Sequence, residues 1–275
     1  MGLATLSFDL SVRGSRAQRH AASTSLVNSL RSTGFVKLTN HGMPLETIQQ
    51  AQEWEDFDFG PPDNTKYPNS WPNNIVPGFR GFTETFHSQC QKLCLDVMSA
   101  CELGCDVPKD TFLNRCVPAA SELRYNYYPS SRRGWPHTDF GTITLLFQDT
   151  KGGLEYEDRR NPGTFIPLVR EKPDEIAINV SDTFQRWTND SIPALQRAGG
   201  CVLPQRHSTA FFLKAHRECM VGAIPEFMNE QRPSSYDDIT ALEYHNRRTQ
   251  VLVKASSAPT AAGALSNKLG CVGCL

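Results

Sequence analysis

From Glu122 onward, the sequence breaks into short runs that are rich in β-branched and aromatic residues. Each run is closed by a cluster of Gly, Pro, Asn or Asp, and this alternation is typical of strands joined by turns. The runs cover residues 123–128, 143–147, 154–156, 164–168, 175–180 and 209–213. Because no helical segment lies between them, the pattern favours an antiparallel barrel or jelly roll over a parallel sheet with crossover helices.

The residues before the first run have a different character. Apolar residues recur at helical spacing over residues 17–30 and 79–104, and an alternating run at 34–39 predicts a short strand between these helices. Residues 51–78 carry many Pro and Asp residues and follow neither period, which predicts a long loop. A last helical pattern covers residues 237–250. The predicted fold class is therefore mainly β with flanking helices.

Composition excludes some classes of function. The chain has 28 basic and 29 acidic residues and a formal net charge of -1, so no strong field would attract nucleic acid or an anionic membrane. No run approaches the roughly 18 apolar residues of a membrane span, and the start of the chain lacks the pattern of a secretory leader. We therefore expect a soluble, cytoplasmic protein that binds neither nucleic acid nor membrane.

Nine cysteines among 275 residues are too few for a disulfide scaffold, and we interpret them as thiols. Cys90, Cys94, Cys101 and Cys105 lie near one stripe of the helix predicted over residues 79–104. This spacing lacks the short Cys-x-x-Cys pairs of zinc sites, so we expect core packing instead of a metal cluster.

The triplet His137-Thr138-Asp139 directly precedes the strand run at 143–147. On an extended backbone His137 and Asp139 project from one face, and an imidazole with a carboxylate can bind a divalent cation. With a second histidine from a distant strand, they would form the 2-His-1-carboxylate site that binds Fe(II). Taken alone, the triplet also fits two ordinary surface residues.

A second candidate is Arg206-His207-Ser208, which leads into the last strand run. On a strand Arg206 and Ser208 share a face, and His207 points the other way. A planar guanidinium and a hydroxyl on one face can bind a carboxylate. The alternative is an ordinary strand edge with an exposed arginine.

Further motifs follow one another along the chain in a fixed order. They are Gly34-Phe35-Val36, Asn40-His41-Gly42, the run 124–149, and residues 152–155, 179–183, 187–189, 206–208 and 242–244. Together they resemble the iron- and 2-oxoglutarate-dependent oxygenases of the isopenicillin N synthase-like superfamily. The resemblance covers most of residues 5–250.

The resemblance implies a double-stranded β-helix, or jelly roll, with helices packed on it. It implies one domain over residues 1–253, with a helical part at 1–120, a jelly-roll core at about 121–215 and a closing helix at about 237–250, followed by a poorly ordered tail at 254–275. The implied activity is Fe(II)- and 2-oxoglutarate-dependent oxidation of a small organic metabolite by O2: a hydroxylation, desaturation or ring closure. Fold similarity does not choose the substrate, and the oligomeric state stays open.

The resemblance also assigns site residues. It assigns the metal to His137 and Asp139. The residues that it assigns to 2-oxoglutarate lie on two neighbouring strand runs: Arg206, Ser208, Tyr128 and Asn126. His41, in the Asn-His-Gly turn, is implied to be structural.

The sequence departs from the family's pattern at two places. The second histidine ligand belongs in a His-Arg-Val-like run after Asn189, yet Gln196 stands at that position, and an amide oxygen is a poorer ligand for Fe(II) than imidazole. Several tens of residues that normally follow the Asn-His-Gly segment are missing around Ala51 to Trp54, as they would be in a splice variant or a mistaken gene model. The alternative function is therefore a non-catalytic or truncated relative on the same scaffold.

Overall fold

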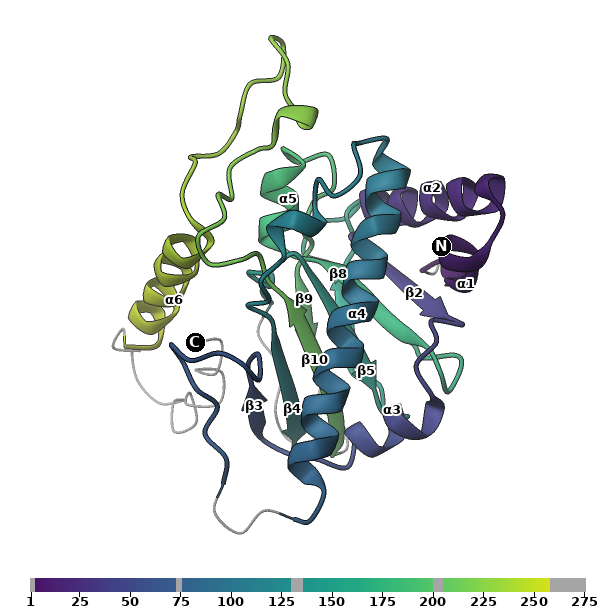
Figure 1. Ribbon diagram of the computed structural model, residues 1–275, viewed down its shortest axis with the longest axis vertical. Coiled ribbons are helices and arrows are strands. Elements are labelled where there is room, and N and C mark those ends of the chain that lie inside the picture. The colour runs from purple at the N-terminus through teal and green to yellow at the C-terminus, as the bar shows by residue number, and fades with distance from the viewer. Residues whose placement is uncertain (1–2, 73–75, 130–135, 200–204, 258–275) are drawn as a thin grey trace.

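The computed structural model describes residues 3–72, 76–129, 136–199 and 205–257 (Figure 1). Its helices are α1 (Asp9–Arg13), α2 (Arg16–Thr33), α3 (Leu45–Ala51), α4 (Phe79–Cys105), α5 (Asp182–Trp187) and α6 (Ala241–Ser257). Its strands are β1 (Thr5–Ser7), β2 (Phe35–Thr39), β3 (Phe57–Phe59), β4 (Glu122–Tyr128), β5 (Ile143–Gln148), β6 (Leu154–Glu157), β7 (Phe165–Pro167), β8 (Ile176–Val180), β9 (Arg197–Gly199) and β10 (Arg206–Leu213). Each predicted run from residue 123 to 213 overlaps one of these strands, and β9 lies outside all of the predicted runs.

The strands form two sheets. The larger sheet has the order β1-β2-β8-β5-β10-β4-β3, and the smaller has the order β7-β6-β9. All of their pairs are antiparallel except that of β1 with β2. Strand β10 pairs with β4 on one side and with β5 on the other, so side chains of these three strands lie next to one another on each face of the sheet.

The two faces of the larger sheet bury different sets of side chains. One face packs against the smaller sheet through Phe35, Leu146, Tyr156 and Phe212. The other face packs against the helices, and α4 runs across it (Figure 1). The alternation of side chains along each strand therefore separates a barrel interior from a helix-covered core.

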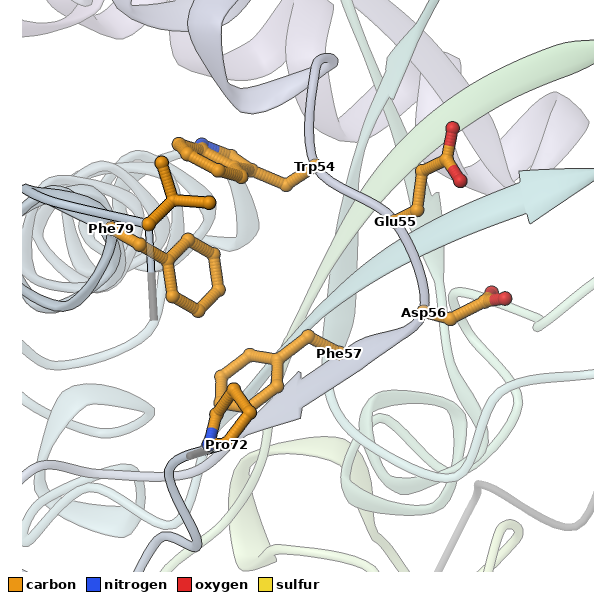
Figure 2. A pocket seen from close by; sticks show the side chains of 7 residues that line it. Trp54, Glu55, Asp56, Phe57, Pro72 and Phe79 are labelled. Atoms are coloured by element: carbon orange, nitrogen blue, oxygen red, sulfur yellow. The ribbon is translucent and has the colours of Figure 1, made fainter. Parts of the chain in front are cut away.

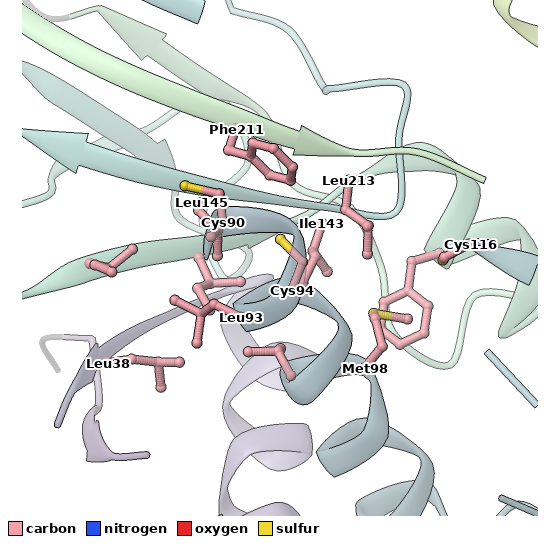
Figure 3. Packing of buried hydrophobic residues seen from close by; sticks show 14 of the residues in the cluster. Leu38, Cys90, Leu93, Cys94, Met98, Cys116, Ile143, Leu145, Phe211 and Leu213 are labelled. Atoms are coloured by element: carbon pink, nitrogen blue, oxygen red, sulfur yellow. The ribbon is translucent and has the colours of Figure 1, made fainter. Parts of the chain in front are cut away.

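The helix-covered core contains the cysteines of α4. Cys90 and Cys94 pack with Leu145 and Phe211 of the sheet (Figure 3). Burial raises the pKa of both thiols well above the ordinary value. The prediction that this stripe is core packing is confirmed. In the described part of the chain, no group of three His, Cys, Asp or Glu side chains could bind a metal ion.

Helix α2 is fixed at both ends and lies against α4. Ser15 and Gln18 form a reciprocal capping box at its start, and Gly34 ends it with a left-handed φ of 64°. At the contact with α4, a Cβ on Gly104 would lie 2.3 Å from the Ser23 carbonyl oxygen. The two helices can approach this closely only because position 104 has no side chain.

Three sequence predictions about elements need correction. The loop predicted at 51–78 contains β3, which the sequence did not show because three residues are too short for a visible period and depend on pairing with β4. Helix α6 begins at Ala241, not at residue 237, and continues to Ser257, into the predicted tail. The rest of that tail, residues 258–275, lies outside the described residues.

His41 makes a structural contact, as the family resemblance implies. Its Nε2 is 2.6 Å from the carbonyl oxygen of Asp174, so it ties the turn after β2 to the segment before β8. Among the described residues, no helix is both long and apolar enough to cross a membrane.

Candidate active site

Arg206 and Ser208 both lie on the interior face of β10, as their spacing predicts. Arg206 is 8% exposed and Ser208 is 4% exposed. His207 points to the opposite side, where its Nε2 lies 2.7 Å from a carboxylate oxygen of Glu55. The structure therefore excludes the alternative of an exposed arginine at an ordinary strand edge.

The Arg206 guanidinium makes few contacts. Its central carbon lies 4.0 Å from the centre of the Tyr128 ring, and Nη1 donates to the Gly152 carbonyl at 3.4 Å. Burial lowers the pKa of Arg206. Within the described part of the chain, no carboxylate lies within 4.0 Å of this buried cation.

Strand β4 brings the other two predicted residues to the same face. Tyr128 is directly opposite Arg206, and Asn126 is directly opposite Ser208. Cross-strand partners in an antiparallel pair point to one side of the sheet. Asn126 Nδ2 also donates to the Ser208 carbonyl at 3.4 Å. The structure thus gathers Arg206, Ser208, Asn126 and Tyr128 in one place, and we call this group the carboxylate face.

Gln148 belongs to the carboxylate face as well, and the sequence analysis missed it. It pairs with Ser208 from the β5 side and is 4% exposed. Its Oε1 is buried and makes no hydrogen bond within the described chain. The sequence does show a polar residue directly after the apolar run 143–147, at a position that shares a strand face with Thr144. An unsatisfied buried amide oxygen is an acceptor that a donor group of a ligand or a bound water would satisfy.

Asp139 lies at the barrel interior with both carboxylate oxygens engaged. Oδ2 accepts from Thr144 Oγ1 at 2.7 Å and from Asn179 Nδ2 at 3.0 Å. Oδ1 accepts from two nitrogens of Arg197, Nη2 at 2.7 Å and Nε at 3.2 Å. Burial would raise the pKa of Asp139, but these partners, Arg197 first, lower it to about 2.

His137 lies beside this carboxylate, as the triplet predicts. Its Nε2 is 3.8 Å from Asp139 Oδ1, and its side chain is 46% exposed. Both groups therefore meet on one side, with Asp139 buried and His137 at the mouth of the barrel.

The placement of Gln196 at the third ligand position is wrong. The Gln196 side chain is exposed, and the next residue, Arg197, points to Asp139. The reason is register: Arg197 pairs with His137 in an isolated bridge and with Tyr156 on β6, so its side chain shares their face. The sequence motif alone could not show which of two adjacent residues faces inward.

Comparisons with known proteins identify the family of this chain. A family model described as the 2OG-Fe(II) oxygenase superfamily matches residues 119–215, and one for the N-terminal part of a non-haem dioxygenase in morphine synthesis matches residues 7–127. The 2-oxoglutarate-dependent dioxygenase imqE of Aspergillus flavus is 43% identical over 81% of this chain and 68% of its own length. The chain belongs to the 2-oxoglutarate/Fe(II)-dependent dioxygenases. Members of this family are oxidoreductases that use Fe(II) and 2-oxoglutarate, so the predicted enzyme class and cofactors are confirmed at the level of the family.

Two further relatives are similar over most of their length. The dioxygenase ecdK of Aspergillus rugulosus is 33% identical over 92% of this chain and 100% of its own. The proline hydroxylase buaE of Petromyces alliaceus is 37% identical over 81% of this chain and 91% of its own. The alignment with ecdK extends over 331 positions, although this chain has 275 residues. Such relatives therefore contain segments without a counterpart in this dioxygenase, in line with the expectation of missing residues.

Solved structures show the fold. A full-length Neurospora crassa protein in complex with alpha-KG and 5-formyluracil superposes with a TM-score of 0.81, at 22% identity, over 89% of this chain and 94% of that one. JOX2 in complex with 2OG, Fe and JA superposes with a TM-score of 0.75, at 17% identity, over 90% of this chain and 85% of that one. The predicted double-stranded β-helix is confirmed.

The segment after α3 lines an aromatic pocket of about 340 Å³. In Figure 2 the rings of Trp54, Phe57 and Phe79 gather around this pocket, whereas the carboxylates of Glu55 and Asp56 point away from it. These rings pack against the helix-covered core. The pocket is therefore on the other side of the larger sheet from the carboxylate face of the dioxygenase.

The carboxylate face fits its expected ligand, whereas the pair of His137 and Asp139 does not. The carboxylate face fits a dicarboxylate, because the buried Arg206 guanidinium and the buried Ser208 hydroxyl lie together there as donors. At the metal half, the described residues supply His137 and Asp139 and add the positive charge of Arg197. Two ligands with a competing cation do not fit the three-ligand face that Fe(II) prefers.

Proposed function

We propose that this dioxygenase binds the distal carboxylate of 2-oxoglutarate at Arg206 and uses this co-substrate in the oxidation of a small organic metabolite. One observation supports the proposal most strongly: the Arg206 guanidinium is buried, and no carboxylate of the described chain lies within 4.0 Å of it, although the charge of Asp149 acts on it from farther away. Burying an unpaired charge costs several kcal/mol, on the order of 3 to 5 when one partner of a buried pair is removed. An anionic ligand at this position would offset that cost.

The neighbours of Arg206 would orient the bound carboxylate. The guanidinium fork supplies parallel donors, and the ring of Tyr128 holds its plane from one side. The Ser208 hydroxyl lies on the same face and would donate a further hydrogen bond. With Asn126, these residues would set the direction in which the 2-oxo end of the molecule points along the barrel.

The substrate we propose is a small organic molecule that enters at the barrel mouth near His137. The exposure of His137 supports this entry route, and the similarity to relatives described as a proline hydroxylase and as 2-oxoglutarate-dependent dioxygenases supports the substrate class. We further propose a cytoplasmic location. The cysteines of the described chain, which are all free, support a reducing compartment.

Calorimetric titration with 2-oxoglutarate tests the carboxylate face. Arg206→Ala should weaken binding about 30-fold or more, because loss of a charged hydrogen-bond partner costs about 2 to 5 kcal/mol. Arg206→Lys keeps the charge and loses the fork, so its affinity should lie between those of Arg206→Ala and the parent.

His207→Ala is the matched control. It changes the adjacent residue on the opposite face of β10, so the affinity for 2-oxoglutarate should stay at the parent's value. Equal affinities in the parent and in Arg206→Ala would overturn the proposal.

A further inference from the structure

We infer that Arg197 takes the place of a metal ion beside Asp139, so that this chain binds 2-oxoglutarate without a metal and takes up a divalent cation only when Arg197 is displaced. The inference rests on the proposed function of the carboxylate face. It concerns the other end of the same co-substrate, the 2-oxo acid end.

The backbone fixes Arg197 at this position. The His137 N–H donates to the Arg197 carbonyl at 3.0 Å, and the Arg197 N–H donates to the His137 carbonyl at 2.9 Å. This reciprocal pair places both side chains on one face of the barrel wall. The side chain of Arg197 therefore contacts the Asp139 carboxylate, which lies beside His137, without any change in the backbone.

The contact with Asp139 leaves no oxygen for a cation. His137 faces Oδ1, and Oδ1 is the oxygen that accepts from both Nε and Nη2 of Arg197. Oδ2 is already committed to Thr144 and Asn179. A divalent cation bound by His137 and Asp139 must compete with two charge-assisted hydrogen bonds at the oxygen it needs.

The ion pair between Arg197 and Asp139 also balances the buried negative charge of the carboxylate. A buried carboxylate without a cation is strongly disfavoured, and Arg197 supplies that cation from the protein itself. The fold therefore does not need a metal to satisfy Asp139.

Arg197 lies in the same barrel interior as the carboxylate face. Its guanidinium carbon is 5.9 Å from the centre of the Phe212 ring, and Phe212 shares the interior face of β10 with Ser208 and Arg206. The charge of Arg197 also contributes, after burial, to the lowered pKa of Arg206. A dicarboxylic 2-oxo acid held by Arg206 would therefore meet a second guanidinium at the position of the metal.

The test uses 2-oxoglutarate and Mn(II) as separate probes on the full chain. We would measure 2-oxoglutarate binding by calorimetry in EDTA and again in saturating Mn(II), and Mn(II) binding by electron paramagnetic resonance. For the parent, the two 2-oxoglutarate dissociation constants should agree within about twofold. For Arg197→Gln, Mn(II) affinity should rise about tenfold or more, and 2-oxoglutarate affinity in EDTA should fall about tenfold.

Two further variants keep the test decisive. Arg197→Lys retains a cation, so it should fold like the parent and bind Mn(II) with an affinity between those of the parent and Arg197→Gln. Gln196→Leu changes the exposed neighbour and should leave both affinities unchanged.

The outcomes separate this inference from the proposed function. Binding of 2-oxoglutarate to the parent only when Mn(II) is present would overturn the inference and leave the carboxylate face intact. An unchanged Mn(II) affinity in both Arg197 variants would also overturn it. No 2-oxoglutarate binding to the parent under either condition would instead overturn the proposed function.

Discussion

His137 and Arg197 face each other as a reciprocally hydrogen-bonded pair, although they lie far apart in the chain. Their pairing decides which residue of the Gln196-Arg197 dipeptide meets Asp139. The motif placed Gln196 at the metal position, whereas the pairing turns Gln196 to solvent and Arg197 inward.

A histidine at position 197 should therefore create a better metal site than one at 196. Arg197→His removes the competing cation and adds an imidazole on the face of His137, so Mn(II) affinity should increase by about tenfold or more. Gln196→His places its imidazole in solvent and should leave Mn(II) affinity near the parent's value. Electron paramagnetic resonance titrations of both variants check this, and a larger gain at position 196 would contradict the register described above.

Two glycines of α4 should respond to alanine in opposite directions. A Cβ at Gly104 would lie 2.3 Å from the Ser23 carbonyl oxygen, so Gly104→Ala should lower the free energy of unfolding by about 1 to 3 kcal/mol. A Cβ at Gly81 would meet nothing within 4 Å, so Gly81→Ala should raise it by about 0.4 to 1 kcal/mol. Urea unfolding measures both changes, and equal effects would show that the contact of α2 with α4 is looser than described.

Lys37 forms a buried ion pair that is expected to be costly to break. Its Nζ lies 3.3 Å from Glu175 Oε1, and the two side chains are 4% and 2% exposed. Lys37→Met leaves the Glu175 carboxylate buried without its cation and should lower the free energy of unfolding by about 3 to 5 kcal/mol. The double variant Lys37→Met/Glu175→Leu removes both charges and should recover most of this loss in the same urea experiment. No recovery would mean that the unpaired Glu175 carboxylate is not the source of the cost.

His245 should make stability depend on pH. Burial, and then the nearby charge of Lys214, lower the pKa of His245 to about 4, against 6.5 in the unfolded chain. The unfolded state binds the extra proton between these values, so the contribution is fully present above pH 6.5 and is lost as pH falls toward about 4.

The loss should be on the order of 1 to 3 kcal/mol, since solvent screens a side chain that is only partly buried. His245→Phe keeps a ring near Phe140, which His245 contacts at a centroid distance of 5.9 Å, and it should flatten the profile between pH 4 and pH 6.5. An unchanged slope in thermal unfolding curves across this window would show that another group titrates there.

Local periodicity was enough to predict one part of the site and one part of the core. Alternation along a strand puts residues 206 and 208 on one face whatever the strand pairs with, so Arg206 and Ser208 could be assigned together. The helical period of residues 79–104 likewise predicted α4 and its buried cysteines.

Features that depend on pairing between distant residues required the three-dimensional structure. The position of Gln148 beside Ser208, the strand β3 against β4, and the choice of Arg197 over Gln196 all follow from register. Register is set by contacts across tens of residues, and a shift of one position reverses the direction of every side chain on the strand. A motif therefore identified the neighbourhood of the metal site, but only the pairing of Arg197 with His137 determines which side chain lies against Asp139.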